Sequence, residues 1–569
     1  MNEQSDRSGR SRLPRMAAAT VPCVLALLVA MGRACAGTQT PDAPLHAALD
    51  EGAAVTGLAG LSKPEQDLLR GIYGRHNFTL LWSSDGHPTP QAVAVAKVLA
   101  SAANYGLNPG EYRARPGDDA PAPSADDVLN ATEAAQFDVA LSAAALRFVE
   151  HVHAGRVDPR AAGFNIGATR PALDAAAILE RLARERDPVL VIASVEPPFV
   201  HYRLLKDALA RYRKIAAAPP LPALAPLRGR PVKPGEAYDG AAALRVRLVA
   251  SGDLPADAAA GNAAPILDAG LVAALKRYQG RHQLDADGVL GAAVVRELSI
   301  PMLQRVRQIE LALERFRWLP ALESPSIIVN IPQFRLFAFK AADDRAADVL
   351  QMDVIVGRSY PQARTPVFAE QMRYVIFRPY WDVPYSITRR EMLPKIAGDP
   401  SYLARERLEI VAGPDDTARP LPASAENIRR LESGALRLRQ QPGPDNSLGL
   451  VKFMLPNAYN VYLHSTPARQ LFSRSVRAFS HGCIRVRDPV TLAAFVLQGT
   501  PGDWTPERIT AAMDGPDSLR VGLARPIPVM IVYTTALATE AGPVLFFHDI
   551  YGHDRELERL LGLAPVAGS

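Results

Sequence analysis

The spacing of hydrophobic positions separates a helical first part of the chain from a strand-rich last part. Residues 91–103 form an uninterrupted run of helix-favouring residues that ends at Tyr-Gly-Leu-Asn-Pro, residues 105–109. Residues 134–153 repeat large apolar side chains every three to four positions. These patterns predict a helical scaffold domain over residues 61–218.

From residue 324 onward the pattern changes to alternation of apolar and polar residues, which is typical of strands. We expect strands over residues 326–331, 334–340, 350–356, 373–377, 451–454, 459–463, 528–534 and 544–547. An irregular stretch, residues 390–444, interrupts this alternation. An insertion of this length favours a lid over a neighbouring site, and the alternative is a tolerated surface excursion. The pattern therefore predicts a mostly β domain over residues 324–555.

Between these two parts, the prolines at 219, 220, 222 and 226 mark a linker over residues 219–234. Residues 235–300 carry three short helical patterns and predict a compact three-helix module. Residues 301–323 predict a connecting helix. The expected fold class is thus multidomain α+β.

The N-terminus has the pattern of an export signal. Four arginines precede an apolar run from Met16 to Met31, and Ala34-Cys35-Ala36 offers a cleavage site. We expect a signal peptide over residues 1–36 and a mobile leader over residues 37–60, which predicts a periplasmic protein. An uncleaved anchor in the inner membrane is the alternative, although a run of about 16 residues is short for a spanning helix.

The net charge of the chain argues against a nucleic-acid partner. The net charge of its 569 residues is +5, and residues 1–36 alone contribute +3 of it. The remaining excess of +2 is no clustered basic surface of the kind that binds a phosphate backbone. We therefore expect no nucleic-acid partner.

Cysteine usage points to one residue. Two of the three cysteines lie in the expected signal, so Cys483 is the remaining thiol of the mature chain. It follows His481 and Gly482 and lies 19 residues after His464. An imidazole can accept the thiol proton and activate the sulfur as a nucleophile, whereas the alternative is a buried, inert cysteine. The backbone N–H groups of Gly482 and Cys483 are candidate donors to a tetrahedral oxyanion.

Residues 480–486, Ser-His-Gly-Cys-Ile-Arg-Val, closely resemble the nucleophile motif of the YkuD-type L,D-transpeptidase family, with His464-Ser465-Thr466 at the place of its catalytic histidine. The resemblance implies a β-sandwich-like domain with Cys483 as nucleophile and His464 as base. It also implies that the Ser465 carbonyl orients the imidazole, that His481 and Gly482 help to form the oxyanion site, and that Arg485 braces the site or meets a substrate carboxylate. Some members carry glycine where this chain has Ser465.

Other segments extend the resemblance to the larger, periplasmic, YcbB-like subgroup. They are residues 78–82, 105–109, 154–157, 380–387 and 448–453. This subgroup has a helical scaffold and a capping insertion. Residues 235–300 resemble the peptidoglycan-binding domain 1 family, with a generic helical spacer as the alternative. Trp381, Tyr462 and Ser480 are the remaining candidate substrate-binding residues.

The resemblance implies acyl transfer on peptidoglycan. Tetrapeptide stems would be donor and acceptor, Cys483 would form a thioester with release of D-Ala, and a second stem would complete a 3→3 cross-link. No metal or organic cofactor is expected; carbapenems are expected inhibitors and cell-wall synthesis enzymes are candidate partners. Two alternatives remain: a cysteine-dependent hydrolase or carboxypeptidase, and a non-catalytic peptidoglycan-binding protein. The order of His464 before Cys483 argues against a papain-like hydrolase.

Overall fold

A computed structural model describes residues 43–50, 63–113, 123–167, 172–257, 264–341, 344, 348–399, 401–413, 417–540, 542–564 and 566. The expected signal peptide and most of the expected leader lie outside these residues. Within the leader, however, Ala43–Asp50 form helix α1, and Leu45 and Leu49 are buried in the core of the helical region. The expectation of a wholly mobile leader was wrong here, because Leu45, Ala48 and Leu49 recur at helical spacing. No helix among the described residues has both the length and the apolar character needed to cross a membrane.

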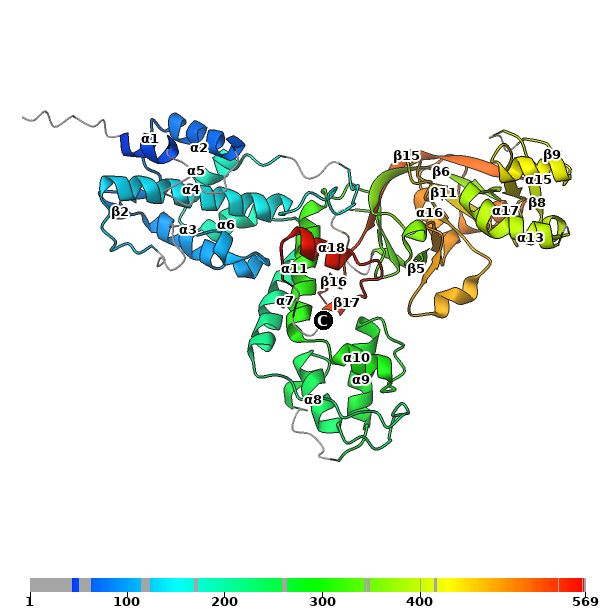
Figure 1. Ribbon diagram of the computed structural model, residues 1–569, viewed down its shortest axis with the longest axis horizontal. Helices are drawn as coiled ribbons and strands as arrows, with labels where there is room; N and C mark the ends of the chain where they lie inside the picture. The colour runs from blue at the N-terminus through cyan, green and yellow to red at the C-terminus, as the bar shows by residue number, and fades with distance from the viewer. Residues whose placement is uncertain are drawn as a thin grey trace, which may run out of the picture. The chain divides into compact units, whose positions relative to one another are not determined.

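Helices make up the first part of the described chain (Figure 1). Helix α4 is capped by Asn130, which forms a capping box with Glu133, and it places Phe137, Leu141 and Phe148 in a shared core. The expectation of a helical N-terminal region is confirmed. The helices are α2 (Lys63–Arg75), α3 (Pro90–Ala100), α4 (Ala131–Ala154), α5 (Ala175–Arg184), α6 (Pro188–Ala193) and α7 (Val200–Ala217), with 3-10 turns η1 (Ala102–Tyr105) and η2 (Pro109–Glu111).

Three helices follow within residues 235–300: α8 (Ala241–Ala250), α9 (Ala269–Arg281) and α10 (Ala292–Leu298). Leucines from all three, with Leu290 from the loop between the last two, form a separate core. Helix α11 (Met302–Trp318) comes next and packs against α7. Its buried side chains belong to two cores, since Ile309 and Leu313 contact α7 while Leu311 and Trp318 contact the β-rich region.

The C-terminal part of the chain is rich in strands, as expected. The strands of its main sheet are β3 (Ser326–Asn330), β4 (Arg335–Phe339), β5 (Leu350–Gly357), β6 (Phe368–Phe377), β11 (Val451–Met454), β12 (Leu463–His464), β13 (Ala478–Ser480), β14 (Ile484–Val486) and β15 (Leu519–Val532). Their order in the described residues is β13-β5-β14-β12-β11-β6-β15-β3-β4, and β4 pairs again with β5. The sheet therefore closes on itself around one core, instead of forming the two separate sheets of a sandwich.

Helices α16 (Pro489–Val496) and α17 (Pro506–Asp514) cover this core, with Leu492 and Ile509 buried in it. The short hairpin of β16 (Ala536–Leu537) and β17 (Leu545–Phe546) and helix α18 (His553–Leu560) complete the chain. Two small strands, β1 (Ser83–Ser84) and β2 (His87–Pro88), pair within the helical region.

The insertion is more ordered than its sequence predicts. Its sheet has the order β7-β10-β8-β9, and it buries its own apolar core, which includes Ile396, Ile410 and Leu438. The elements are β7 (Trp381–Val383), α12 (Tyr385–Ile387), the π-helix η5 (Thr388–Met392), α13 (Leu393–Gly398), α14 (Tyr402–Arg405), β8 (Leu408–Val411), β9 (Pro420–Leu421), α15 (Ala425–Glu432) and β10 (Arg437–Gln440). The strands of this unit were not expected, and the folded unit begins before residue 390, since β7 is part of its sheet.

Candidate functional site

Strand register brings the candidate residues to one face of the main sheet. Lys452 on β11 pairs with His464 on β12, and His464 pairs with Arg485 on β14. The alternate residues Phe453, Leu463 and Ile484 point into the core. Because side chains alternate along a strand, Lys452, His464 and Arg485 lie side by side on the opposite face. Tyr462 and Cys483 come one position before the paired Leu463 and Ile484, so they lie on this same face. A backbone hydrogen bond joins the two segments, since the Ile484 N–H donates to the Tyr462 carbonyl at 3.0 Å.

The turn that carries Cys483 is held from within. Ser480 is 2% exposed; its hydroxyl donates to the Cys483 carbonyl at 2.5 Å and accepts the Gly482 N–H at 3.1 Å. Gly482 has a φ of +119°, a backbone conformation that residues other than glycine rarely adopt. Two expectations therefore need correction. Ser480 braces this turn instead of facing a substrate, and the Gly482 N–H is already paired, which removes it as an oxyanion donor.

The thiol of Cys483 is half-buried. Its Sγ donates to the Asn460 carbonyl at 3.7 Å. Burial raises the pKa of Cys483, although hydrogen bonds from the Tyr462 backbone and hydroxyl and the charges of Lys452 and Arg485 act to lower it. Burial also raises the pKa of Tyr462 well above its usual value, so its hydroxyl keeps its proton. Tyr462 can therefore donate to the sulfur and stabilise a thiolate when one forms.

His464 is buried and neutral. Its Nδ1 lies 2.6 Å from the Ser465 carbonyl, which can only accept, so Nδ1 carries the ring proton. Burial first, and then the charge of Arg485, lower the pKa of His464 to about 3, against the opposing effect of the Ser465 and Leu448 carbonyls. A neutral imidazole has one ring proton, so Nε2 has a free lone pair and can accept a proton.

The side chain of Ser465 has a structural role of its own. Its Oγ accepts the N–H groups of Leu450 and Val451 at 2.7 and 3.1 Å and donates to the Leu448 carbonyl at 3.2 Å. A Cβ on Gly449, whose φ is +65°, would lie 2.2 Å from this oxygen. Ser465 therefore fixes the loop before β11 that faces His464.

Arg485 makes no hydrogen bond or ion pair with any residue in the described part of the chain, and its buried Nε has no partner. Burial lowers the pKa of Arg485, opposed by the negative charge that Cys483 carries as a thiolate. An arginine left unpaired beside a nucleophile can bind a carboxylate with two parallel hydrogen bonds.

Two contacts join the insertion to this face. His481 Nε2 lies 2.7 Å from Glu391 Oε1 on the π-helix η5, and both side chains are about one-third exposed. Trp381, on β7, lies close enough to the Tyr462 hydroxyl to act to lower its pKa. The structure thus brings all nine candidate residues to one region, in different roles: Cys483, His464, Arg485, Tyr462 and Trp381 around the thiol, Ser465, Ser480 and Gly482 in the supporting main chain, and His481 against the insertion.

Sequence reasoning missed Lys452, Glu391, Asn460 and Thr365. Lys452 lies in the segment that suggested the subgroup, and only the register with His464 reveals its position. Glu391 lies in the stretch that had no clear pattern. Thr365 is 1% exposed, and its hydroxyl donates to the Gly482 carbonyl at 2.7 Å. No local signal marks Thr365, because the contact spans 117 residues of sequence.

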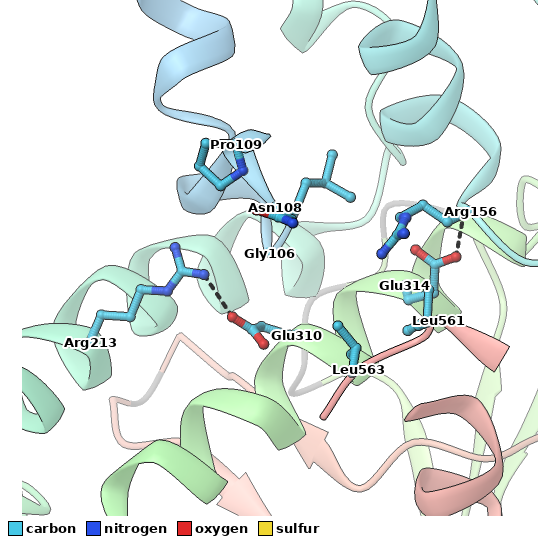
Figure 2. A pocket seen from close by; sticks show the side chains of 10 residues that line it. Gly106, Asn108, Pro109, Arg156, Arg213, Glu310, Glu314, Leu561 and Leu563 are labelled. Carbon is cyan, nitrogen blue, oxygen red and sulfur yellow. Dashed lines mark hydrogen bonds and ion pairs between the residues drawn. The ribbon is translucent and has the colours of Figure 1, made fainter. Parts of the chain in front are cut away.

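A hollow of about 220 Å³ lies between residues 105–109, Arg156, helix α11 and the C-terminal segment (Figure 2). Its charged side chains already have partners. Arg213 Nη2 lies 2.6 Å from Glu310, Arg156 Nη2 lies 2.9 Å from Glu111, and Glu314 accepts the Arg156 and Val157 N–H groups. The motifs at residues 105–109 and 154–157 therefore contact the connecting helix. None of the nine candidate residues lines this hollow.

Among the described residues, no group of three or more His, Cys, Asp or Glu side chains is placed to hold a metal ion. The chemistry available at the site is that of a thiol, a neutral imidazole and the guanidinium of Arg485. This set suits nucleophilic attack on a carbonyl carbon with transfer of the acyl group.

Comparison with known proteins agrees with this chemistry. Residues 324–503 match the family model of the L,D-transpeptidase catalytic domain, YkuD, and residues 67–209 match that of a scaffold domain. A protein of Haemophilus influenzae named "Putative L,D-transpeptidase" is 32% identical over 244 residues, which are 43% of this chain and 47% of the relative. The match thus spans about half the length of that relative. The chain therefore carries a region that matches the L,D-transpeptidase catalytic domain, YkuD, over residues 324–503, and a region that matches a scaffold domain over residues 67–209.

Proposed function

We propose that this protein is a periplasmic L,D-transpeptidase that forms 3→3 cross-links between peptidoglycan stem peptides through a thioester on Cys483. The observation that carries the proposal is the common face shared by Cys483, a neutral His464 and an unpaired Arg485, within a domain of this family. Tetrapeptide stems have free carboxylates, which suit Arg485 as a binding partner.

In the proposed chemistry, the proton of Sγ moves to Nε2 of His464 as the sulfur attacks. The sulfur attacks the carbonyl carbon between diaminopimelate and D-Ala, a C–S bond forms, and the carbonyl electron pair moves to oxygen. When the tetrahedral intermediate collapses, the C–N bond breaks and His464 returns its proton to the departing D-Ala amine. Tyr462 stabilises the sulfur, and Arg485 binds a stem carboxylate and adds a positive charge near the reacting atoms.

In the second half-reaction the side-chain amine of another stem attacks the thioester carbonyl. His464 accepts the amine proton, the new C–N bond forms, and the C–S bond breaks to regenerate Cys483. Water at this step would instead give a tripeptide, as in a carboxypeptidase. We propose that the insertion acts as a lid that excludes water, because Glu391 and Trp381 join it to the catalytic face.

We further propose that residues 235–300 bind peptidoglycan and that residues 1–36 direct export. The first proposal is supported by the separate core of α8, α9 and α10, which agrees with the resemblance of residues 235–300 to a three-helix module. Cell-wall synthesis enzymes are proposed partners, since cross-linking must follow the polymerisation of glycan strands.

The test uses the full chain with purified disaccharide-tetrapeptides, followed by mass spectrometry of the products. We expect 3→3 dimers and free D-Ala from the wild type and neither from Cys483→Ala. Tripeptide without dimers would favour the hydrolase alternative. Sacculus binding with no product of either kind would favour the non-catalytic alternative.

A second expectation concerns inhibitors. Carbapenems resemble the D-Ala-containing end of the donor, so one equivalent should acylate Cys483 and raise the intact mass of the protein by a single adduct. Cys483→Ala should stay unmodified. An unchanged mass of the wild type at high drug concentration would contradict this expectation.

A further inference from the structure

The Gly482 carbonyl, one bond from the catalytic residue, is held by a buried hydroxyl. Thr365 Oγ1 donates to this carbonyl at 2.7 Å and accepts the Gly357 N–H at 2.9 Å. The Thr365 hydroxyl therefore has a defined direction, because its single proton is directed to Gly482 while Gly357 occupies an acceptor position.

A tyrosine from the end of the chain fixes Thr365 in turn. The Tyr551 hydroxyl donates to the Gly357 carbonyl at 2.6 Å and accepts the Thr365 N–H at 3.1 Å. Tyr551 is 2% exposed, and burial raises its pKa, so the hydroxyl remains protonated. Tyr551 lies beyond the residues that match the catalytic family model, which end at 503. A Cβ on Gly357 would lie 2.0 Å from the Ala363 carbonyl, so this arrangement also depends on glycine.

The direction of the Gly482 carbonyl decides the direction of the next N–H. In a planar trans peptide, the C=O of one residue and the N–H of the following residue point in opposite directions. Because the Gly482 oxygen points toward buried Thr365, the Cys483 N–H points away from it. This N–H makes no hydrogen bond to any residue that the structure describes. It is therefore a free donor beside the sulfur.

A glycine at this position makes the alternative orientation accessible. Gly482 already has a φ of +119°, and glycine tolerates a wide range of backbone angles, so little steric cost opposes rotation of the Gly482–Cys483 peptide. Rotation by about half a turn would exchange the free N–H for a carbonyl oxygen, which would repel a developing oxyanion.

We propose that Thr365, itself fixed by Tyr551 and Gly357, is a positioning residue that keeps the Gly482–Cys483 peptide oriented with its N–H toward the substrate oxyanion. The inference rests on the proposed acyl-transfer function. It assigns the oxyanion donor to the Cys483 N–H, since the Gly482 N–H is paired with Ser480.

The test compares two reagents on the full chain. p-Nitrophenyl acetate acylates a thiol through a tetrahedral oxyanion, whereas iodoacetamide alkylates it by displacement without one. For Thr365→Val, which keeps the shape and removes the hydroxyl, we expect the acylation rate of Cys483 to fall by roughly 10- to 100-fold. The alkylation rate should stay within about 2-fold of the wild type, because the thiol itself is not displaced.

Two further variants make the result specific. Thr365→Ser retains a hydroxyl and should restore acylation to within about 3-fold of the wild type, whereas Tyr551→Phe should lower acylation selectively but less than Thr365→Val does. Tyr551→Phe also replaces Thr365→Val as the decisive variant if the latter fails to fold.

Equal loss of both reactions would mean that Thr365 only maintains the fold, and unchanged acylation would mean that the peptide needs no such support. Either result overturns the inference. So does a wild type that reacts with neither reagent, since Cys483 would then not be an accessible nucleophile. Neither reagent is a peptidoglycan peptide, so this test does not depend on the proposed substrate. If the wild-type protein forms no 3→3 dimers but Thr365→Val still loses acylation selectively, the inference holds and the proposed substrate is refuted.

Discussion

At the scale of single residues, the environment of Cys483 favours a neutral thiol before substrate arrives. Burial raises the pKa of Cys483 and lowers the pKa of His464 to about 3, so neither group is charged near neutral pH. Tyr462, Lys452 and Arg485 oppose the effect of burial on the sulfur. A resting thiol of this kind reacts slowly with solvent electrophiles, and the base acts only when proton transfer accompanies attack.

Removing the Tyr462 hydroxyl should therefore make the thiol less acidic. Tyr462→Phe removes a donor to the thiolate, which raises the pKa of Cys483 further, so fewer molecules carry a thiolate at a given pH below that pKa. A hydrogen bond to a charged group contributes about 1.5 kcal/mol or more, so alkylation by iodoacetamide at pH 7 should slow by roughly 10-fold.

The pH profile of alkylation is the measurement that checks this expectation. The wild-type rate should rise as pH increases through the pKa of Cys483, and the midpoint for Tyr462→Phe should lie at higher pH. Tyr459→Phe is a suitable control, because Tyr459 is exposed and its ring contacts Phe368 at a tilt instead. A profile of Tyr462→Phe that coincides with that of the control would remove Tyr462 from this role.

The sequence revealed those site residues whose chemistry lies in a contiguous motif. Cys483 and His464 were identifiable because a lone thiol and two histidines fall within about 20 residues. Thr365 and Tyr551 were not, because their roles come from hydrogen bonds made after the sheet closes. The expected role of the Gly482 N–H failed for a local reason, since Ser480 reaches it within the same turn.

At the scale of secondary-structure elements, strong periodic patterns gave the correct structure. Helix α16 has a local start signal, since the Asp488 side chain accepts the Thr491 N–H and Pro489 is its first residue. The start of β15 at Leu519 was missed, because much of its first half is exposed and lacks apolar alternation. The expected strand at residues 459–463 shrinks to Leu463–His464, since Asn460 has a φ of +55° and Asn457 binds both sides of the turn.

The insertion shows why short, polar strands escape detection. Strand β10 reads Arg-Leu-Arg-Gln, yet it lies at the centre of the insertion sheet between β7 and β8. Arg439 is buried there against Glu409 at 2.7 Å. Replacing residues 390–444 by a flexible link would also remove the partner of β7, which carries Trp381. A point change is therefore the better test of a lid.

Glu391→Gln should weaken the contact between the insertion and His481 while retaining the shape of the side chain. Loss of the acceptor charge from a partly exposed contact costs about 1 kcal/mol or less, so the closed arrangement should lose at most about 5-fold in population. Greater access of water should raise the ratio of tripeptide to 3→3 dimer by about 2- to 5-fold, measured by mass spectrometry. Glu426→Gln, on the exposed start of α15, is the matched control. The same product ratio in both variants would argue for a surface excursion.

At the scale of the whole molecule, hydrogen bonds connect the three-helix module to the C-terminal segment. Arg281 Nη1 donates to the Val544 carbonyl at 2.7 Å, and Gln283 accepts the His548 N–H at 2.9 Å. Glu297, in the module, binds Arg305 on α11 and lies 3.4 Å from His548. The sequence could not predict this junction, because its residues lie in three separate segments with no shared pattern.

Arg281 should accordingly be important for stability. Its side chain is 7% exposed, its Nε lies 2.7 Å from Asp253 Oδ1, and Asp253 is 3% exposed. Arg281→Ala would leave a buried carboxylate without its partner and would remove the bond to Val544. Loss of one partner of a buried ion pair costs about 3–5 kcal/mol, so the midpoint of thermal unfolding should fall clearly. Arg296→Ala, on the exposed side of α10, should leave it unchanged.

The same variant tests whether the module and the catalytic domain depend on each other. Val544 and Tyr551 lie on either side of β17 in one short segment. Loss of the hydrogen bond at Val544 should therefore also loosen Tyr551, which holds Thr365. Arg281→Ala should therefore lower the temperature at which Cys483 loses its reactivity with p-nitrophenyl acetate, in parallel with the unfolding midpoint. If the unfolding trace instead separates into an early transition of the module and an unchanged temperature for loss of reactivity, the module is an independent attachment, and the Arg281–Val544 bond contributes nothing to the catalytic domain.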